Sequence, residues 1–135
     1  MGERQNHMEN FLLGESESEF LKKFLKDKLS SLLGNSGVRV LEYSLARVLR
    51  EDPFTVFIES PRAFYNGMSR IFGKGADALL RLLFASILKQ NLATPSTSPE
   101  ELLSYLKIGD MESRTKLIKE LMKAMRATER DFNFG

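Results

Sequence analysis

The chain has 135 residues, of which 42% are hydrophobic and 28% charged, and these are the proportions of one globular domain rather than of a disordered chain. Its 20 basic and 18 acidic residues leave a formal net charge of +2, which does not by itself indicate a nucleic-acid partner. The chain has no cysteine and one histidine, His7. This composition argues against thiolate or His-rich metal sites and a Ser-His-Asp triad, and it favours an intracellular protein.

Residues 1–16 are expected to form a polar leader outside the fold. The pair His7-Met8 is compatible with a cloning remnant joined to a natural start, so the sequence leaves open whether residues 1–7 are native. No segment approaches the roughly 18 consecutive apolar residues of a membrane-spanning helix, and the N-terminus lacks the basic and apolar regions of a signal peptide. We therefore expect a cytoplasmic protein with no membrane partner.

Capping residues and helical periodicity divide the first two thirds of the chain into helices. Ser16 with Glu19 forms a capping-box pattern, Gly34 is a stop signal, and Asn35-Ser36 is expected to cap the helix that follows. Asp52-Pro53 and Ser60-Pro61 repeat a cap followed by proline. The segment 54–59 is also compatible with a strand, but it would lack a partner strand. The predicted helices cover about residues 17–33, 37–50, 54–59, 61–72 and 76–92.

Residues 93–98 are uncharged and rich in turn formers, so they are predicted to be a linker. After it, Ser98-Pro99 with Glu101 starts a helix that runs to Gly109, and Asp110 caps a last helix that ends near Thr128. A polar tail, 129–135, follows. Because hairpin signals are missing, we predict an all-α fold. Its parts are a compact bundle of four to five helices over residues 17–92 and a two-helix extension over 99–128.

Four short motifs in the middle of the chain carry a family resemblance: Leu33–Gly37, Leu41–Leu45, Pro61–Phe64, and Ile71–Ala76 leading into Leu79-Leu80. They are similar to the archaeal nitrosopolaris output domain family, which consists of small helical modules found alone or attached to signalling proteins. The resemblance covers about residues 17–90. It implies an output role in archaeal signalling, with the signal arriving through a partner because the chain has no room for a sensor domain. It implies no functional residue.

Apolar faces on all of the longer helices favour a non-enzymatic interaction or oligomerisation module. The last helix places Leu117, Leu121, Met122 and Met125 on one face. These four side chains are the candidate protein contacts, either in a homo-oligomer or with another protein. Burial of the same side chains inside the monomer is the alternative.

The alternative function is that of a nucleic-acid-binding regulator or chromatin-associated protein. Residues 34–92 hold eight basic and five acidic groups, and residues 114–135 hold six and three, so each segment has a net charge of +3. In the last helix the basic residues advance by three or four positions and form one stripe, roughly opposite the apolar face. The candidate nucleic-acid contacts are Lys116, Lys119, Lys123, Arg126 and Arg130. Such a stripe is also typical of a solvated helix surface.

An enzyme is not expected. The carboxylate pairs Glu51-Asp52 and Glu100-Glu101 lie at predicted helix starts, where the helix dipole accounts for them without catalysis. Neither pair has a companion histidine, and no phosphate-loop motif is present. We therefore expect no catalytic residue, no cofactor and no metal. An apolar ligand pocket between helices remains an open alternative.

Overall fold

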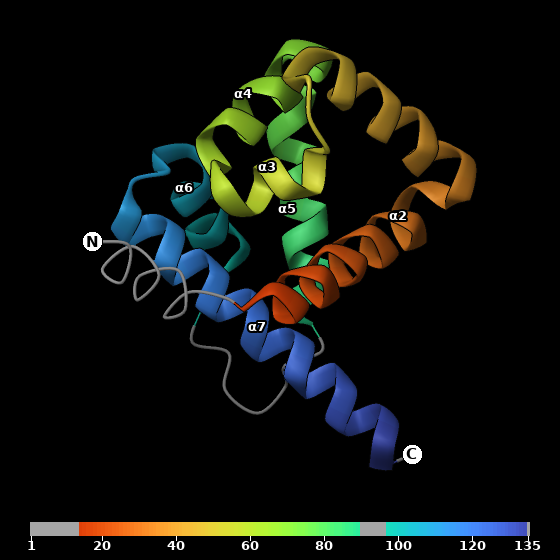
Figure 1. Cartoon of the computed structure of the whole chain (residues 1–135), viewed down its shortest axis with the longest axis vertical. Helices are drawn as coiled ribbons and strands as arrows, with labels where there is room; N and C mark the ends of the chain where they lie inside the picture. Colours follow the sequence, from red (N-terminus) through yellow and green to blue (C-terminus); the bar gives the residue numbers. More distant parts are fainter. Residues whose placement is uncertain (1–13, 90–96, 135) are drawn as a thin grey trace.

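The structure of the protein is a computed structural model. It describes the backbone of residues 14–89 and 97–134 and the side chains of residues 14–89 and 97–127. Six helices and no strand are found in these residues, so the predicted all-α fold is confirmed and the strand alternative for 54–59 is wrong. The helices are α2 (Glu15–Leu49), α3 (Pro53–Glu59), α4 (Pro61–Phe72), α5 (Gly75–Leu88), α6 (Pro99–Ile108) and α7 (Met111–Phe134), as labelled in Figure 1.

Helix α2 consists of two arms that meet at Gly34 (Figure 1). Gly34 has φ 81° and ψ 162°, a conformation that is essentially restricted to glycine. The predicted stop at Gly34 is therefore confirmed, but no loop separates the two helices, and the expected caps Asn35-Ser36 are already helical. An ion pair of 3.4 Å between Lys26 Nζ and Glu42 Oε1 joins the two arms.

Three of the predicted helix starts have the expected cap. Asp52 Oδ2 accepts a hydrogen bond of 2.9 Å from the Thr55 amide, and Asp110 Oδ1 accepts one of 2.8 Å from the Ser113 amide. Ser98 forms the full capping box with Glu101. Ser60 precedes α4 as predicted, but its side chain makes no capping hydrogen bond.

Several helix boundaries differ from the predicted ones. Helix α2 begins at Glu15, inside the expected leader, while residues 1–13 lie outside the described residues. Helix α5 ends at Leu88 rather than near residue 92, and most of the predicted linker also lies outside the described residues. Helix α7 continues to Phe134, through the segment predicted as a polar tail. Only its backbone is described beyond residue 127.

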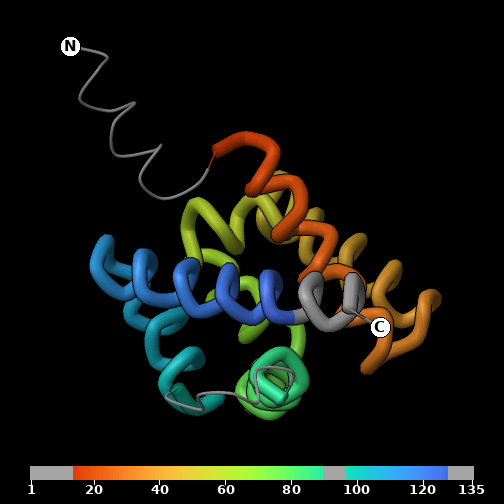
Figure 2. The backbone as a smooth tube through the Cα atoms, turned by 90° about the horizontal axis from the view of Figure 1, so that it is seen from below, coloured from red at the N-terminus to blue at the C-terminus, as the bar shows by residue number. Residues whose placement is uncertain are grey.

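Helices α6 and α7 are part of the same hydrophobic core as α2–α5, rather than an extension beside it. Seen from below, α7 crosses the molecule beside the first arm of α2 and the end of α5 (Figure 2). Arg114 on α7 also donates a hydrogen bond of 2.6 Å to the carbonyl oxygen of Ile58, which closes the end of α3. The core side chains that α6 and α7 contribute include Leu102, Leu103, Leu106, Leu117, Ile118 and Leu121.

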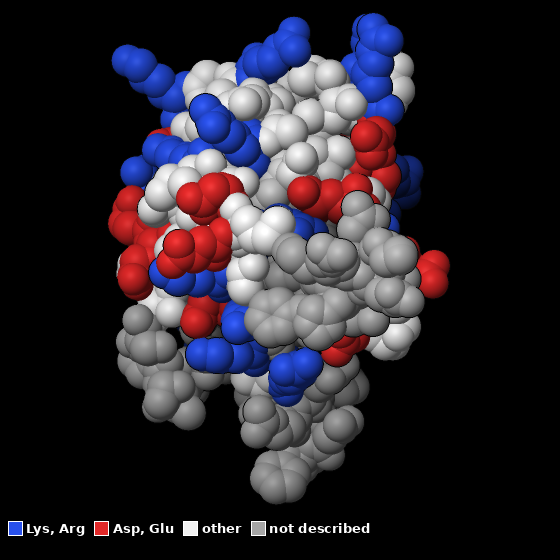
Figure 3. All heavy atoms as spheres, turned by 60° about the vertical axis from the view of Figure 1, so that its left-hand side comes forward, with Lys and Arg blue, Asp and Glu red and all other residues white. Residues whose placement is uncertain are grey.

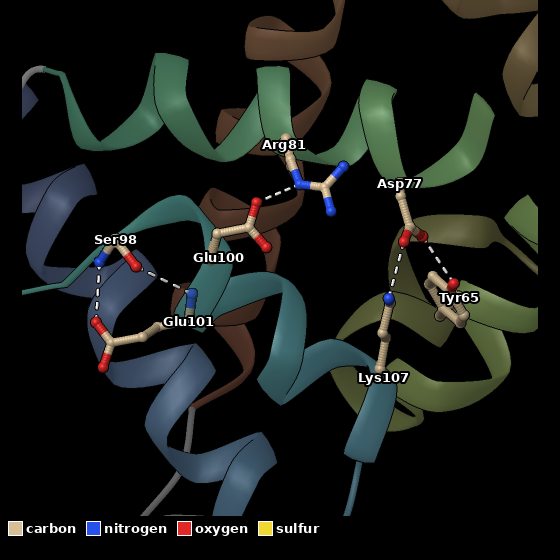
Figure 4. A network of polar contacts seen from close by, with 7 residues as sticks. All are labelled: Tyr65, Asp77, Arg81, Ser98, Glu100, Glu101 and Lys107. Atoms are coloured by element: carbon tan, nitrogen blue, oxygen red, sulfur yellow. Dashed lines mark hydrogen bonds and ion pairs between the residues drawn. The ribbon is translucent and has the colours of Figure 1, made fainter. Parts of the chain in front are cut away.

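Polar contacts fix α6 against α4 and α5 (Figure 4). Asp77 on α5 accepts hydrogen bonds from Tyr65 Oη at 2.7 Å and from Lys107 Nζ at 2.8 Å. Both hydrogen bonds lower the pKa of Asp77, and the bond from Lys107 has the larger effect. The Asp77 carboxylate in turn raises the pKa of Lys107. A second ion pair, between Arg81 and Glu100, joins α5 to the start of α6.

None of the described helices is both long and apolar enough to span a bilayer.

Candidate functional site

The four apolar side chains expected to contact a protein partner are buried inside the chain. Leu117 and Leu121 are 0% exposed, Met122 is 6% exposed and Met125 is 7% exposed. All four belong to the core that α7 shares with the other helices. The prediction of a contact surface made of these residues is therefore wrong, because the face of α7 that carries them is already covered by the protein itself.

The basic stripe on α7 is on the surface, but acidic neighbours occupy much of it. Its ion pairs are Lys116 with Glu112 at 3.2 Å, Lys123 with Glu120 at 3.3 Å and Arg126 with Glu17 at 3.5 Å. The hydrogen bond to Glu112 raises the pKa of Lys116. Lys119 also has an interaction partner, and the side chain of Arg130 lies outside the described residues. A phosphate that approached this stripe would have to compete with these carboxylates.

A different group of cations surrounds a hollow where the ends of α2 and α4 meet. The hollow has a volume of ≈ 500 Å³ and is open to solvent. We call it the arginine hollow, because three of its six lining residues are arginines. It is lined by Ser44, Arg47, Val48, Arg50, Arg70 and Ile71.

The packing of α4 on α2 brings these arginines together. Gly67 on α4 lies so close to α2 that a Cβ atom at this position would be 3.0 Å from Leu49 Cδ2. Since Arg70 follows Gly67 by about one helical turn, this close approach places Arg70 beside the end of α2. Arg50 ends α2 in a left-handed conformation, with φ 63° and ψ 25°, and its amide donates to the Ala46 carbonyl oxygen at 2.7 Å.

The backbone of Arg50 is unusual for its residue type. The left-handed conformation at a helix end normally belongs to glycine, since a side chain with a Cβ atom adopts it at a cost. Arg50 is the only residue other than glycine with a positive φ among those the structure describes. The chain thus carries an arginine at a position where a glycine would end the helix more favourably.

The arginines of the hollow have no acidic partner. Within residues 14–89 and 97–127, none of Arg47, Arg50 and Arg70 forms an ion pair with a carboxylate. All three are exposed. In the face shown in Figure 3, lysine and arginine side chains lie along the upper end, and the acidic side chains lie below it together with further basic side chains. This end of the molecule can therefore attract an anion without first breaking an internal ion pair.

A second hollow, of ≈ 440 Å³, lies between the arms of α2 and the start of α3. It is also lined by basic residues, but each of them is paired. The pairs are Lys22 with Glu19 at 3.2 Å, Lys23 with Asp27 at 3.1 Å and Lys26 with Glu42 at 3.4 Å. The contrast marks the arginine hollow, rather than this second one, as the candidate binding site.

Sequence analysis missed the arginine hollow because its members come from two helices. A signal was present in the net charge of +3 on residues 34–92, and α4 itself contains Arg62 and Arg70 but no acidic residue. What the sequence does not show is which of these cations fold next to a carboxylate. That information depends on how α4 packs against α2.

In the described part of the chain, no group of three or more His, Cys, Asp or Glu side chains is placed to hold a metal ion. Comparisons with protein-family models, curated proteins and solved structures give no match. The resemblance of the middle of the chain to the output domain family therefore stays a prediction.

Proposed function

We propose that the protein is a non-enzymatic binding module whose partner is a nucleic acid, held through the arginine hollow. The observation that carries this proposal is that Arg47, Arg50 and Arg70 gather around one open hollow and have no acidic partner among the residues that the structure describes. Arginine is suited to this task, since its planar guanidinium group forms paired hydrogen bonds with phosphate oxygens and stays charged. Such contacts would make binding tolerant of sequence and sensitive to salt.

Burial of the apolar face of α7 also favours this function over oligomerisation. With Leu117, Leu121, Met122 and Met125 inside the core, the apolar face that suggested contacts with a protein partner is used for folding. The proposed role remains that of a binding module, but the surface that carries it is cationic and lies on α2 and α4. A place in archaeal signalling, as the family resemblance implies, is compatible with such a role.

The proposal is tested by fluorescence anisotropy of a labelled oligonucleotide titrated with the full chain at several salt concentrations. The variant combines Arg47→Gln, Arg50→Gly and Arg70→Gln. Glycine at position 50 suits the left-handed backbone, so the change removes a cation without weakening the helix end. We expect the affinity to fall at least about tenfold, and the slope of log K against log salt to become shallower by about 2, as three lost phosphate contacts require.

The matched control combines Lys116→Gln, Lys119→Gln and Lys123→Gln, which changes the net charge by the same amount on α7. Because acidic neighbours already offset much of this stripe, we expect most of the affinity to remain. A loss of binding in the control but not in the arginine variant would move the site to α7 and overturn the hollow as the binding surface. If the unaltered protein binds no oligonucleotide at low salt, nucleic acid is not the partner. Circular dichroism confirms that each variant is folded.

A further inference from the structure

Next to the arginine hollow, α2 carries an exposed aromatic side chain that the core does not use. Tyr43 is 67% exposed, and it is adjacent in sequence to Ser44, which lines the hollow. The other two tyrosines, Tyr65 and Tyr105, are partly buried against the core. Tyr43 therefore presents its ring to solvent rather than to the hydrophobic core.

Tyr43 stands in a line of arginines on one side of the second arm of α2. Arg39, Tyr43 and Arg47 follow one another at intervals of four residues, so these three share one face of the helix. Arg50 follows just past the end of α2 and lines the arginine hollow together with Arg47. All four are exposed. Arg39 and Arg47 are separated by about 12 Å along the helix axis, and Tyr43 lies midway between them in the sequence. The guanidinium carbon of Arg47 lies 5.8 Å from the centroid of that ring.

Alternation of cations with an aromatic ring is what a single strand of nucleic acid requires. Unpaired bases stack on aromatic side chains, while arginine and lysine neutralise the phosphates on either side. A duplex keeps its bases paired and stacked within the helix, so it would contact the arginines but would offer Tyr43 no base. Resting on the function proposed above, we propose that the protein prefers single-stranded nucleic acid and that Tyr43 is the platform on which a base stacks.

The test compares three probes with the same full-length protein: an oligothymidylate of about 12 nucleotides, a strand of the same length in which every sugar lacks its base, and a duplex of that length. The variants are Tyr43→Ala and Tyr43→Phe. We expect the unaltered protein to bind the thymidine strand about tenfold more tightly than the base-free strand, and more tightly than the duplex. Tyr43→Ala should reduce the affinity for the thymidine strand to that for the base-free strand, which itself should be unchanged. Tyr43→Phe should keep the preference, because a phenyl ring also stacks.

Tyrosine fluorescence gives an independent measurement, since the chain has three tyrosines and no tryptophan. Stacking on Tyr43 should quench part of the emission when the thymidine strand binds, and Tyr43→Phe should remove this quenching while binding persists. Equal affinities for the thymidine and base-free strands, an equal loss for both in Tyr43→Ala, or tighter binding of the duplex would each overturn the inference.

The two proposals fail in distinguishable ways. If the arginine variant binds all three probes as tightly as the unaltered protein does, the arginine hollow is not the binding surface and the proposed function is wrong. If the arginine variant loses affinity for all three but Tyr43→Ala does not distinguish the thymidine strand from the base-free strand, the hollow stands and only the stacking role of Tyr43 is rejected.

Discussion

At the scale of single residues, Asp77 on α5 connects three helices. Its carboxylate accepts hydrogen bonds from Lys107 on α6 and Tyr65 on α4, and these bonds lower its pKa below the ordinary value of 3.8. A carboxyl group whose pKa is lower in the folded state stabilises the fold above its ordinary pKa. That stabilisation is lost as the pH falls through the lowered value.

We therefore expect Asp77→Asn to decrease the free energy of unfolding by about 1 kcal/mol at neutral pH, which is the scale of a partly exposed charged hydrogen bond. The difference in the free energy of unfolding between the two proteins should shrink as the pH falls from 3.8 through the lowered pKa of Asp77. Below that pKa, Asp77 is protonated in both the folded and the unfolded state. Urea unfolding followed by circular dichroism at several pH values measures this difference in the free energy of unfolding. Comparing the two proteins at each pH removes the contribution of other carboxyl groups. A difference that is constant down to pH 2 would show that its cause is not the charge of Asp77.

At the scale of elements, the bend in α2 depends on one backbone conformation. Gly34 has φ 81°, and a Cβ atom at this position would meet no other atom within 4 Å, so the constraint is conformational rather than steric crowding by neighbours. We expect Gly34→Ala to decrease the free energy of unfolding by about 1–3 kcal/mol, the cost of placing a side chain in this region. Urea unfolding at fixed pH is the measurement.

Gly75 supplies the matched control for Gly34. It is the first residue of α5, its φ is not positive, and a Cβ atom there would make only an ordinary contact of 3.8 Å with Phe72 Cβ. Because alanine suits a helix better than glycine, Gly75→Ala should leave the stability unchanged or raise it by up to about 1 kcal/mol. Equal destabilisation by the two substitutions would mean that the bend does not depend on the conformation of Gly34.

The elements also show which parts of the structure can be predicted from sequence. Caps are local, so Asp52, Ser98 and Asp110 were predictable from the few residues that follow each of them. The ends of α5 and α7 were not. Helix α5 ends at Leu88 although the helical pattern continues, and α7 continues to Phe134 through a segment whose polar composition predicts a tail. The candidate site was the least predictable. Arg47, Arg50 and Arg70 gain significance only from the packing of α4 on α2 and from the absence of a nearby carboxylate among the described residues.

At the scale of the whole molecule, the sequence suggested a bundle with an extension, and the structure has a single core instead. The apolar residues of α7 face inward because α7 packs on α6 and crosses beside the first arm of α2 and the end of α5 (Figure 2). Periodicity identifies which face of a helix is apolar, but it does not identify what covers that face. Here part of the cover comes from α2 and α5, which are far away in the sequence.

A single core implies that the helices unfold together, which a substitution in α7 tests. Leu121 is 0% exposed, so Leu121→Ala should decrease the free energy of unfolding by about 2–5 kcal/mol. The exposed neighbour Lys123 is the control. Lys123→Ala should change the free energy of unfolding by less than about 1 kcal/mol. Hydrogen exchange followed by mass spectrometry should show that Leu121→Ala decreases the protection of the slowest amides in α5 as much as in α7. Loss of protection confined to α6 and α7 would instead mean that these two helices unfold as a separate unit.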